Sequence, residues 1–308
     1  MIILRQQSAK KIAKFAAFLM LFQPLILVAQ NADKQTNTPV PNALIAEPGM
    51  ADPHALVVGK VCYLFTGHDI GFGISDWVMP DWRIYRSVDF KTWKLVGTIK
   101  PEENYMGKGN TSCWAGDIVH KNGKYYWYFS NRKESSGVMV ASKPEGPYVD
   151  VLKKPLVDSF DPTVFTDDDG TSYIIYGANH YKIARLKKSM IELDEQPRVI
   201  TINRSTFFPD TDKNSLHKYN GIYYLSCSGY YATSSNIYGP YETKGVVGKG
   251  FGIDTPFAHG DFFVWKGNWY HVWCKYRNRD YDRIRDCFIA PLVYDKDGLM
   301  HDDLRAMK

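Results

Sequence analysis

The stretch that decides the fold is Gly123-Lys-Tyr-Tyr-Trp-Tyr-Phe129, a turn glycine followed by a strand dense in aromatic residues. The phrase recurs as Gly59-Lys-Val-Cys-Tyr-Leu-Phe65, Gly170-Thr-Ser-Tyr-Ile-Ile-Tyr176, Gly221-Ile-Tyr-Tyr-Leu-Ser-Cys227 and Gly267-Asn-Trp-Tyr-His-Val-Trp273. Successive glycines are 64, 47, 51 and 46 residues apart. A period in this range is typical of a β-propeller with one blade per repeat. The five copies therefore predict an all-β fold, a five-bladed β-propeller.

Turn signals separate the expected strands along the chain. Asn-Gly or Asp-Gly dipeptides stand at 122–123, 169–170, 220–221 and 297–298, and they favour hairpins because both turn residues adopt positive φ. Gly-Pro-Tyr occurs at 146–148 and 239–241, each time after a repeat strand, which predicts two equivalent loops between blades. No linker divides the chain, so we expect a single propeller domain over residues 48–308.

The N-terminal segment has the pattern of an export signal. A basic stretch is followed by an apolar run over residues 15–29, broken once at 23–24, and residues 28–30 fit a cleavage site. The run is too short and interrupted for a spanning helix, and no Cys follows it to carry a lipid. We predict a signal peptide over 1–30, a flexible leader over 31–47, and a secreted or periplasmic mature protein without a membrane anchor.

Charge and cysteine content narrow the class of partner. The formal net charge is +5, but residues 1–30 hold four basic and no acidic residues, so the remainder is near +1. This gives no support for binding to nucleic acid or an anionic membrane. Five cysteines show no metal-site spacing, and their odd number leaves at least one free thiol. We expect most to be buried small hydrophobes, while one disulfide remains open.

Acidic residues recur where the innermost strand of each blade should begin. There the sequence reads Ala51-Asp-Pro-His54, Trp114-Ala-Gly-Asp117, Phe160-Asp-Pro-Thr-Val-Phe165, Asp210-Thr-Asp-Lys-Asn-Ser215 and Ala258-His-Gly-Asp261. Proline after aspartate fixes an extended entry and cannot donate to a central ladder, which suits a funnel rim. Since inner strands gather around one axis, these acids should converge on one cavity. Cleavage of a glycosidic bond needs two carboxyl groups, one protonated and one ionised.

In this order, the Ala51–His54, Trp114–Asp117 and Asp161–Phe165 motifs, with the 217–225 strand, resemble glycoside hydrolase family 43. The resemblance runs from about residue 52 to 292. It implies a five-bladed propeller that hydrolyses with inversion, by default an exo-acting α-L-arabinofuranosidase or β-xylosidase on fragments of plant or algal polysaccharide. By position it implies Asp52 as general base, Asp161 as the acid that modulates and orients the proton donor, and His259 as an axial histidine holding calcium or its water shell. Calcium is not required for the chemistry.

The third acid departs from the family pattern. The family usually has Glu five residues before the position of His217, where this chain has Asp212. Aspartate is one methylene shorter, and positioning errors of that size are costly. We take Asp212 as the proton donor, with Asp210 and His217 as alternatives.

Three rival functions follow from this uncertainty over the donor and from the fold. If no donor exists, the protein is a non-catalytic sugar-binding propeller. A related propeller family cleaves anhydro-galactose units from red-algal galactans, and some of its members use His as the acid, so a galactosidase is a further alternative. A protein-interaction scaffold is the third, and the Asp pattern argues against it.

Aromatic and polar side chains near the expected mouth are candidates for contact with an oligosaccharide or polysaccharide. Trp114 precedes an inner strand, and Trp77 lies on a long first-blade insertion of the kind that often carries specificity. Both are predicted to stack on sugar rings. The predicted polar contacts are His54, His68, Asp117 and His217.

Overall fold

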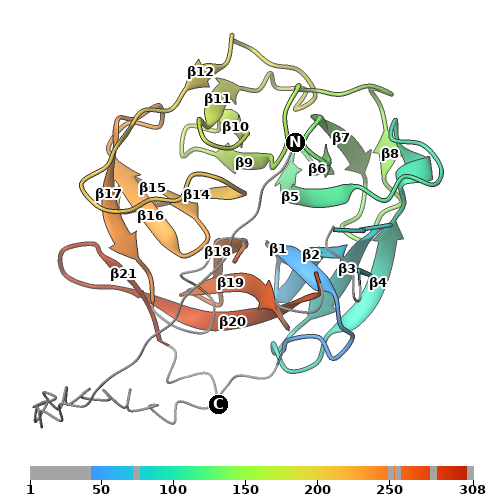
Figure 1. The fold of residues 1–308 in the computed structure, drawn as a ribbon, viewed down its shortest axis with the longest axis horizontal. Helices are drawn as coiled ribbons and strands as arrows, with labels where there is room; N and C mark the ends of the chain where they lie inside the picture. The colour runs from blue at the N-terminus through green and yellow to red at the C-terminus, as the bar shows by residue number, and fades with distance from the viewer. Residues whose placement is uncertain (1–42, 72–76, 249–252, 254–257, 278–282, 304–308) are drawn as a thin grey trace, which may run out of the picture. The chain divides into compact units, whose positions relative to one another are not determined.

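The computed structural model describes residues 43–71, 77–248, 253, 258–277 and 283–303. The predicted signal peptide and most of the leader lie outside the described residues. The described chain is all-β apart from one 3-10 turn, Pro101–Glu103. Its strands form five separate sheets, which confirms the five-bladed propeller (Figure 1). No helix among the described residues is long and apolar enough to cross a membrane.

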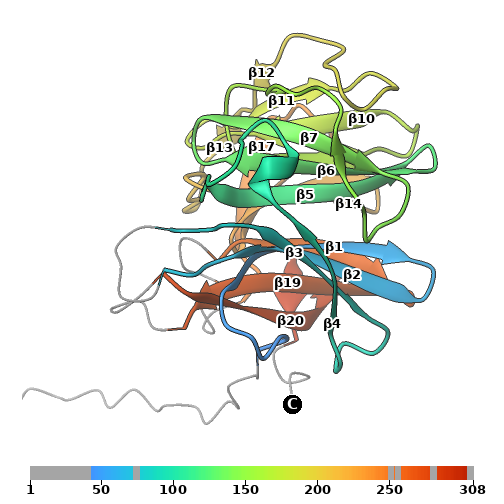
Figure 2. The same cartoon turned by 90° about the vertical axis from the view of Figure 1, so that its right-hand side faces the viewer.

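Each blade is an antiparallel sheet built from consecutive strands, and the strands of one blade lie side by side in the edge-on view (Figure 2). Blade 1 contains β1 (Met50–Val58), β2 (Val61–His68), β3 (Trp82–Ser87) and β4 (Lys94–Ile99). Blade 2 contains β5 (Cys113–Lys121), β6 (Lys124–Asn131), β7 (Ser135–Ala141) and β8 (Val149–Asp150). Blade 3 contains β9 (Thr163–Thr166), β10 (Ser172–Tyr176), β11 (Lys182–Arg185) and β12 (Arg198–Val199).

The last two blades follow the same plan with one addition. Blade 4 contains β14 (Asn214–Tyr219), β15 (Ile222–Cys227), β16 (Tyr230–Ser234) and β17 (Tyr241–Val246). A short strand, β13 (Ile202–Asn203), pairs in parallel with β17 at its outer edge. Blade 5 contains β18 (Gly260–Trp265), β19 (Asn268–Tyr276), β20 (Arg285–Tyr294) and β21 (Met300–Asp302).

The repeated phrase marks the hairpin between the first and second strand of every blade. Its glycine has a φ between 60° and 83° in all five copies, a conformation that glycine adopts without steric cost. The aromatic strand that follows is buried, and its rings pack between neighbouring blades. Phe65 of blade 1 stacks on Trp127 of blade 2, with ring centroids 5.3 Å apart. The aromatic content of the repeats is therefore mainly inter-blade core.

The first strands β1, β5, β9, β14 and β18 surround one axis, each in contact with the next (Figure 1). The contact between β18 and β1 closes the ring. Because every inner strand begins at the same end of this axis, residues just before or at the strand starts meet in one place. That is the position of the predicted acids.

The predicted position of the Gly-Pro-Tyr loops is wrong. The Gly-Pro-Tyr loops lie within blades, between the third and fourth strands, and not between blades. Each leads into an outer strand, and its buried tyrosine donates a hydrogen bond to the carbonyl four residues earlier, Tyr148 to Pro144 and Tyr241 to Ile237.

All five cysteines are buried and free, as expected for small hydrophobes, and the possible disulfide is not formed.

Candidate active site

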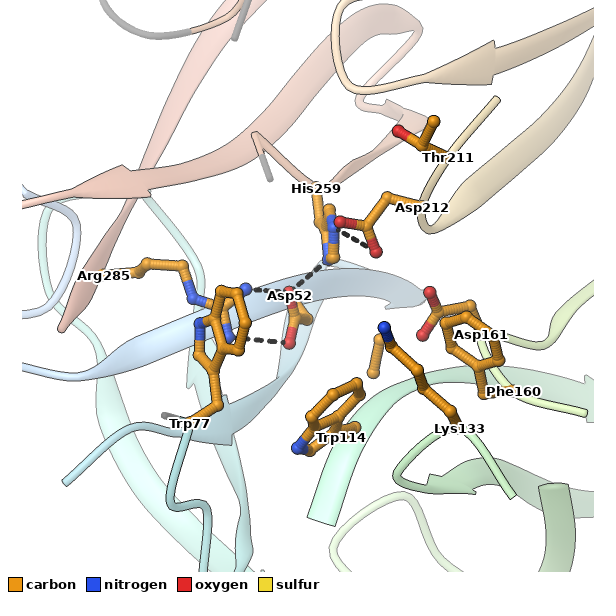
Figure 3. Close-up of a pocket in the computed structure, with 11 residues that line it drawn as sticks. Asp52, Trp77, Trp114, Lys133, Phe160, Asp161, Thr211, Asp212, His259 and Arg285 are labelled. Atoms are coloured by element: carbon orange, nitrogen blue, oxygen red, sulfur yellow. Dashed lines mark hydrogen bonds and ion pairs between the residues drawn. The ribbon is translucent and has the colours of Figure 1, made fainter. Parts of the chain in front are cut away.

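A cavity of about 160 Å³ opens at the end of the axis where the inner strands begin (Figure 3). It is lined by Asp52, Trp77, Trp114, Ala115, Lys133, Phe160, Asp161, Thr211, Asp212, His259 and Arg285. All three predicted catalytic acids and both predicted tryptophans are therefore brought together. The volume is below the ~300–1,000 Å³ of sites for drug-sized ligands, so the cavity suits a group the size of one sugar ring.

The two Asp-Pro sequences share an unusual backbone. Asp52 has a φ of 49° and Asp161 a φ of 56°, in the left-handed region that non-glycine residues rarely occupy and that costs about 1–3 kcal/mol. The register of β1 against β2 shifts between residues 51 and 54. Such irregularities re-aim side chains, and here both carboxyl groups belong to the cavity wall.

Asp52 is buried between two cationic groups. Arg285 donates to it through Nη1 at 2.6 Å and Nη2 at 3.2 Å, and His259 Nδ1 lies 2.5 Å from Oδ1. Burial alone would raise the pKa of this carboxyl, but Arg285 and His259 outweigh burial and hold the pKa well below its usual range. Asp52 is therefore ionised across the working pH range, as a general base must be.

Arg285 is fixed from its other side by a second buried acid. Asp69 accepts from Arg285 Nε at 2.9 Å, from Nη2 at 3.0 Å and from the backbone N–H at 3.1 Å. The guanidinium is thus clamped between Asp69 and Asp52, each bound by two of its nitrogens. Bidentate pairs of this kind restrict orientation as well as position.

His259 connects the first acid to the third. Its Nε2 lies 3.0 Å from Asp212 Oδ1, so the imidazole ring separates Asp52 from Asp212 (Figure 3). Burial disfavours the charged ring, but Asp212 and Asp52 outweigh it and raise the pKa of His259 to about 10. Asp52 and Asp212 therefore lie against the two different nitrogens of one imidazole ring.

Asp161 and Asp212 affect each other's pKa. Burial and the neighbouring Asp212 raise the pKa of Asp161 well above its usual value. Burial also acts to raise the pKa of Asp212, but His259 and a hydrogen bond with Asp161 lower it overall. Like charges at short range disfavour ionisation of both groups, so a proton is held more strongly by Asp161 than by Asp212.

The tryptophans form one wall. Trp77 and Trp114 meet edge to face with centroids 5.9 Å apart, and the Trp82 Nε1–H donates to the Trp114 carbonyl at 2.7 Å. Arg283 lies over the Trp77 ring at 4.7 Å, and Arg132 lies over Trp114 at 5.5 Å. The wall offers aromatic surface backed by cations.

Four predicted substrate contacts do not line this cavity. His54, Asp117 and His217 line a second cavity towards the far ends of the inner strands, because each lies two or more residues beyond a strand start and a strand advances about 3.3 Å per residue. His54 Nδ1 is 2.8 Å from Asp117 Oδ1, and His217 Nε2 is 2.7 Å from the Tyr294 hydroxyl. His68, at the end of β2, pairs with Asp81 at 3.0 Å.

The alternative proton donors are also elsewhere. Asp210 is bound by Arg204 at 2.5 Å and is not a wall residue of the cavity. Burial lowers the pKa of His217 to about 3, so its ring is neutral at working pH as well as distant from the acids. The carboxyl groups available to a substrate in the cavity are those of Asp52, Asp161 and Asp212.

A calcium ion at His259 does not fit this arrangement. A histidine ligand must be neutral, with a lone pair towards the metal, whereas the two His259 nitrogens lie 2.5 Å from Asp52 and 3.0 Å from Asp212. Calcium also takes six to eight oxygen ligands. Among the described residues, no group of three or more His, Cys, Asp or Glu is arranged to hold a metal ion.

Several wall residues were not anticipated from the sequence. Arg285 comes from the last blade, Lys133 from the loop between β6 and β7, and Phe160 precedes Asp161. An arginine at the start of the largely apolar β20 was a usable signal, because a buried charge needs a partner. Nothing in the local sequence marks Lys133, whose ammonium group points into the cavity (Figure 3).

Comparisons with known proteins identify the family of the chain. The family model "Glycosyl hydrolases family 43" matches residues 44–300. A "Xylosidase/arabinosidase" of Bacteroides ovatus is 30% identical, covering 81% of this chain and 93% of that protein. A "Beta-xylosidase" of Xylanibacter ruminicola is 29% identical, covering 81% and 95%.

A solved structure agrees at the level of the fold. The GH43_1 enzyme from Xanthomonas citri, complexed with xylotriose, superposes with a TM-score of 0.74 at 24% identity, covering 86% of this chain and 93% of that one. The sequence resemblance is thus confirmed. The chain belongs to glycosyl hydrolases family 43 and is an inverting glycoside hydrolase with a five-bladed propeller fold.

Proposed function

We propose that this protein is an exported, exo-acting β-xylosidase or α-L-arabinofuranosidase that removes one terminal pentose from a plant oligosaccharide. The observation that carries the proposal is a small cavity whose wall brings together Asp52, held by Arg285 and His259, and the acids Asp161 and Asp212. The names of the relatives, a xylosidase/arabinosidase and a β-xylosidase, supply the sugar class. The basic-then-apolar sequence of residues 1–30 supplies the export signal.

Asp52 acts as general base in this proposal. Its carboxylate is held ionised and oriented by Arg285 and His259, so it can take a proton from water as the water attacks the anomeric carbon. The attack comes from the face opposite the leaving oxygen, which gives inversion. Because Arg285 and His259 fix its orientation beforehand, little reorganisation accompanies the step.

Asp212 takes the proton that Asp161 holds and passes it to the leaving oxygen. The pair holds one proton because the two carboxyl groups are close and buried. His259 lies against Asp212 and stabilises the carboxylate left there after transfer. The three acids and His259 thus perform both halves of a general acid–base mechanism.

The test is hydrolysis of a panel of xylo-oligosaccharides, arabinoxylan, arabinan, arabinogalactan, agaro- and carrageenan-oligosaccharides, with the Asp52→Asn variant as blank. We expect release of xylose or arabinose by the wild type alone, with the product formed as the inverted anomer by NMR. Release of a galactose-type sugar instead would replace the pentose assignment. Saturable binding to a member of the panel without product from any of them would favour the sugar-binding alternative.

A further inference from the structure

Lys213 is a lysine buried on the propeller axis, next to Asp212 in the chain. Only 2% of the surface of Lys213 is exposed, whereas lysine is almost never fully buried without a partner. A buried charge is costly unless it is paired and hydrogen-bonded. The groups around Lys213 therefore indicate what it does.

The ammonium group joins the two chain segments that carry the acid pair. Lys213 Nζ donates to Thr163 Oγ1 and to the Asn214 carbonyl, the latter at 2.7 Å. Thr163 Oγ1 donates to the same carbonyl at 2.7 Å, and Asn214 Nδ2 donates to the Asp161 carbonyl at 3.1 Å. Residues 161–163 and 212–214 are therefore locked together, and this lock sets how Asp161 faces Asp212.

The same group lies among carboxylates of both cavities. Burial lowers the pKa of Lys213, but this is opposed by Asp117, Asp161, Asp261 and Asp52. Asp117 and Asp261 are in turn positioned by His54, at 2.8 and 3.5 Å from its Nδ1. The positive charge of Lys213 therefore interacts with acids of the active-site cavity and with acids of the second cavity.

We propose that Lys213 is the resident cation of the propeller axis, which positions the Asp161–Asp212 pair and makes the site independent of a divalent metal ion. The positioning part rests on the proposed function, because it concerns the proton donor. The metal-independence part rests on contacts: the ammonium group is held by Thr163 and Asn214, and both nitrogens of His259 lie against carboxylates, so neither faces a metal ion.

The first experiment measures thermal unfolding and hydrolysis of the wild-type protein after EDTA treatment and after addition of calcium. We expect Tm and kcat to be unchanged in both cases. Loss of either on EDTA treatment, with recovery on adding calcium, would overturn metal independence. The Tm readout needs no substrate, so failure of this inference is distinguishable from failure of the proposed function.

The second experiment compares Lys213→Met, which keeps the length without the charge, with Lys213→Arg, which keeps the charge. Lys218→Met is the matched control, because Lys218 follows on β14 and pairs with Asp167 and Asp168 at 2.7 and 2.8 Å, away from the acid pair. We expect Lys213→Met to lower Tm by about 5–10 °C at pH 7.5, since it leaves buried carboxylates uncompensated. The deficit should shrink at pH 5, where protonation neutralises them.

The pH profile separates positioning from mere structural support. Removing a positive charge raises the pKa of neighbouring carboxyl groups, so the alkaline limb of kcat should move to higher pH in Lys213→Met and stay in place in Lys213→Arg. We also expect kcat at the optimum to fall about 10²-fold, as for a misplaced catalytic group. A Lys213→Met variant that matches Lys218→Met in Tm, kcat and pH limbs would refute the proposal.

Discussion

Arg285 binds Asp52 through two hydrogen bonds, at 2.6 and 3.2 Å, although 233 positions separate them in the chain. Asp52 stands at the start of the first blade and Arg285 at the start of β20 in the last. Closure of the ring between β18 and β1 brings these blades together. The proposed base is therefore assembled only when the propeller closes.

Replacing Arg285 by lysine should impair catalysis more than stability. Lysine retains the charge but cannot bind Asp52 and Asp69 in a bidentate manner, so the carboxylate of Asp52 loses its fixed orientation. We expect kcat/KM to fall about 10²-fold, measured by pentose release. Arg83→Lys is the matched control, because Arg83 pairs with Glu47 and Asp81 outside the cavity. Equal activity of the two variants would contradict an orienting role for Arg285.

The donor role of Asp212 can be separated from the role of Asp161 by the leaving group. An aryl glycoside with an acidic phenol leaves without proton donation, whereas xylobiose does not. We expect Asp212→Asn to lose about 10²–10⁴-fold in kcat on xylobiose and far less on the aryl glycoside. Asp161→Asn should move the alkaline limb of the kcat–pH profile to lower pH, because the carboxyl group that holds the proton of the pair is then absent. If Asp161→Asn alone is spared on the aryl glycoside, the two roles must be exchanged.

His259 should make stability depend on pH. Its pKa is raised from 6.5 to about 10 in the folded protein, so its contribution is fully present below pH 6.5 and is lost as pH rises to 10. One proton gives a slope of at most about 1.4 kcal/mol per pH unit. We expect the free energy of unfolding of the wild type to exceed that of His259→Asn below pH 6.5. The difference should decrease as the pH rises to 10, as measured by urea denaturation.

The exposed His301 provides the control for that measurement. It pairs with Asp295 at the surface, 3.2 Å away, so His301→Asn should follow the wild type across the same range. A difference between wild type and His259→Asn that does not change from pH 6.5 to 10 would mean that His259 is not held as a cation.

The tryptophan wall should affect substrate binding. Trp77 and Trp114 both line the cavity, and loss of ~1.4 kcal/mol of stacking corresponds to a tenfold change in affinity. We therefore expect Trp114→Ala to raise KM about tenfold on xylo-oligosaccharides, while Trp114→Phe keeps most of the affinity. Trp93→Ala is the control, because Trp93 packs on Phe90 at the edge of blade 1. An unchanged KM in Trp114→Ala would assign its ring to packing alone.

Reducing agents should leave the protein unchanged. All five cysteines are buried and free, and burial raises the pKa of Cys62, Cys113, Cys227, Cys274 and Cys287. Thiols that stay protonated react slowly. We expect identical Tm with and without dithiothreitol and no fast reaction with a thiol reagent in the native state. A lower Tm under reducing conditions would indicate a disulfide.

The blade structure was readable from the sequence because it depends on local properties. A glycine at positive φ, a run of aromatic and β-branched residues, and their recurrence every 46–64 residues specify hairpins that stack radially. The same repeat placed Asp52 and Asp161 at strand starts, where the structure brings both to one cavity. Periodicity also indicated that most aromatics belong to the inter-blade core, as they do.

Depth along the axis was decided by the tertiary structure. His54 and Asp117 lie close in sequence to Asp52 and Trp114, yet they line the second cavity, because two or three residues of strand move a side chain about 7–10 Å along the axis. The sequence contains their order but not which end of the axis each one faces.

The sequence by itself determined the propeller, the first hairpin of each blade and the strand starts that carry the acids. Only the tertiary structure decided the electrostatics, because the cations that set them come from distant segments: Arg285 and His259 from blade 5 act on Asp52 in blade 1, and Lys213 from blade 4 binds Thr163 in blade 3. Hydrophobic periodicity is a property of neighbouring residues. The charge state of a buried acid depends on every group within a few ångströms, whatever its place in the chain.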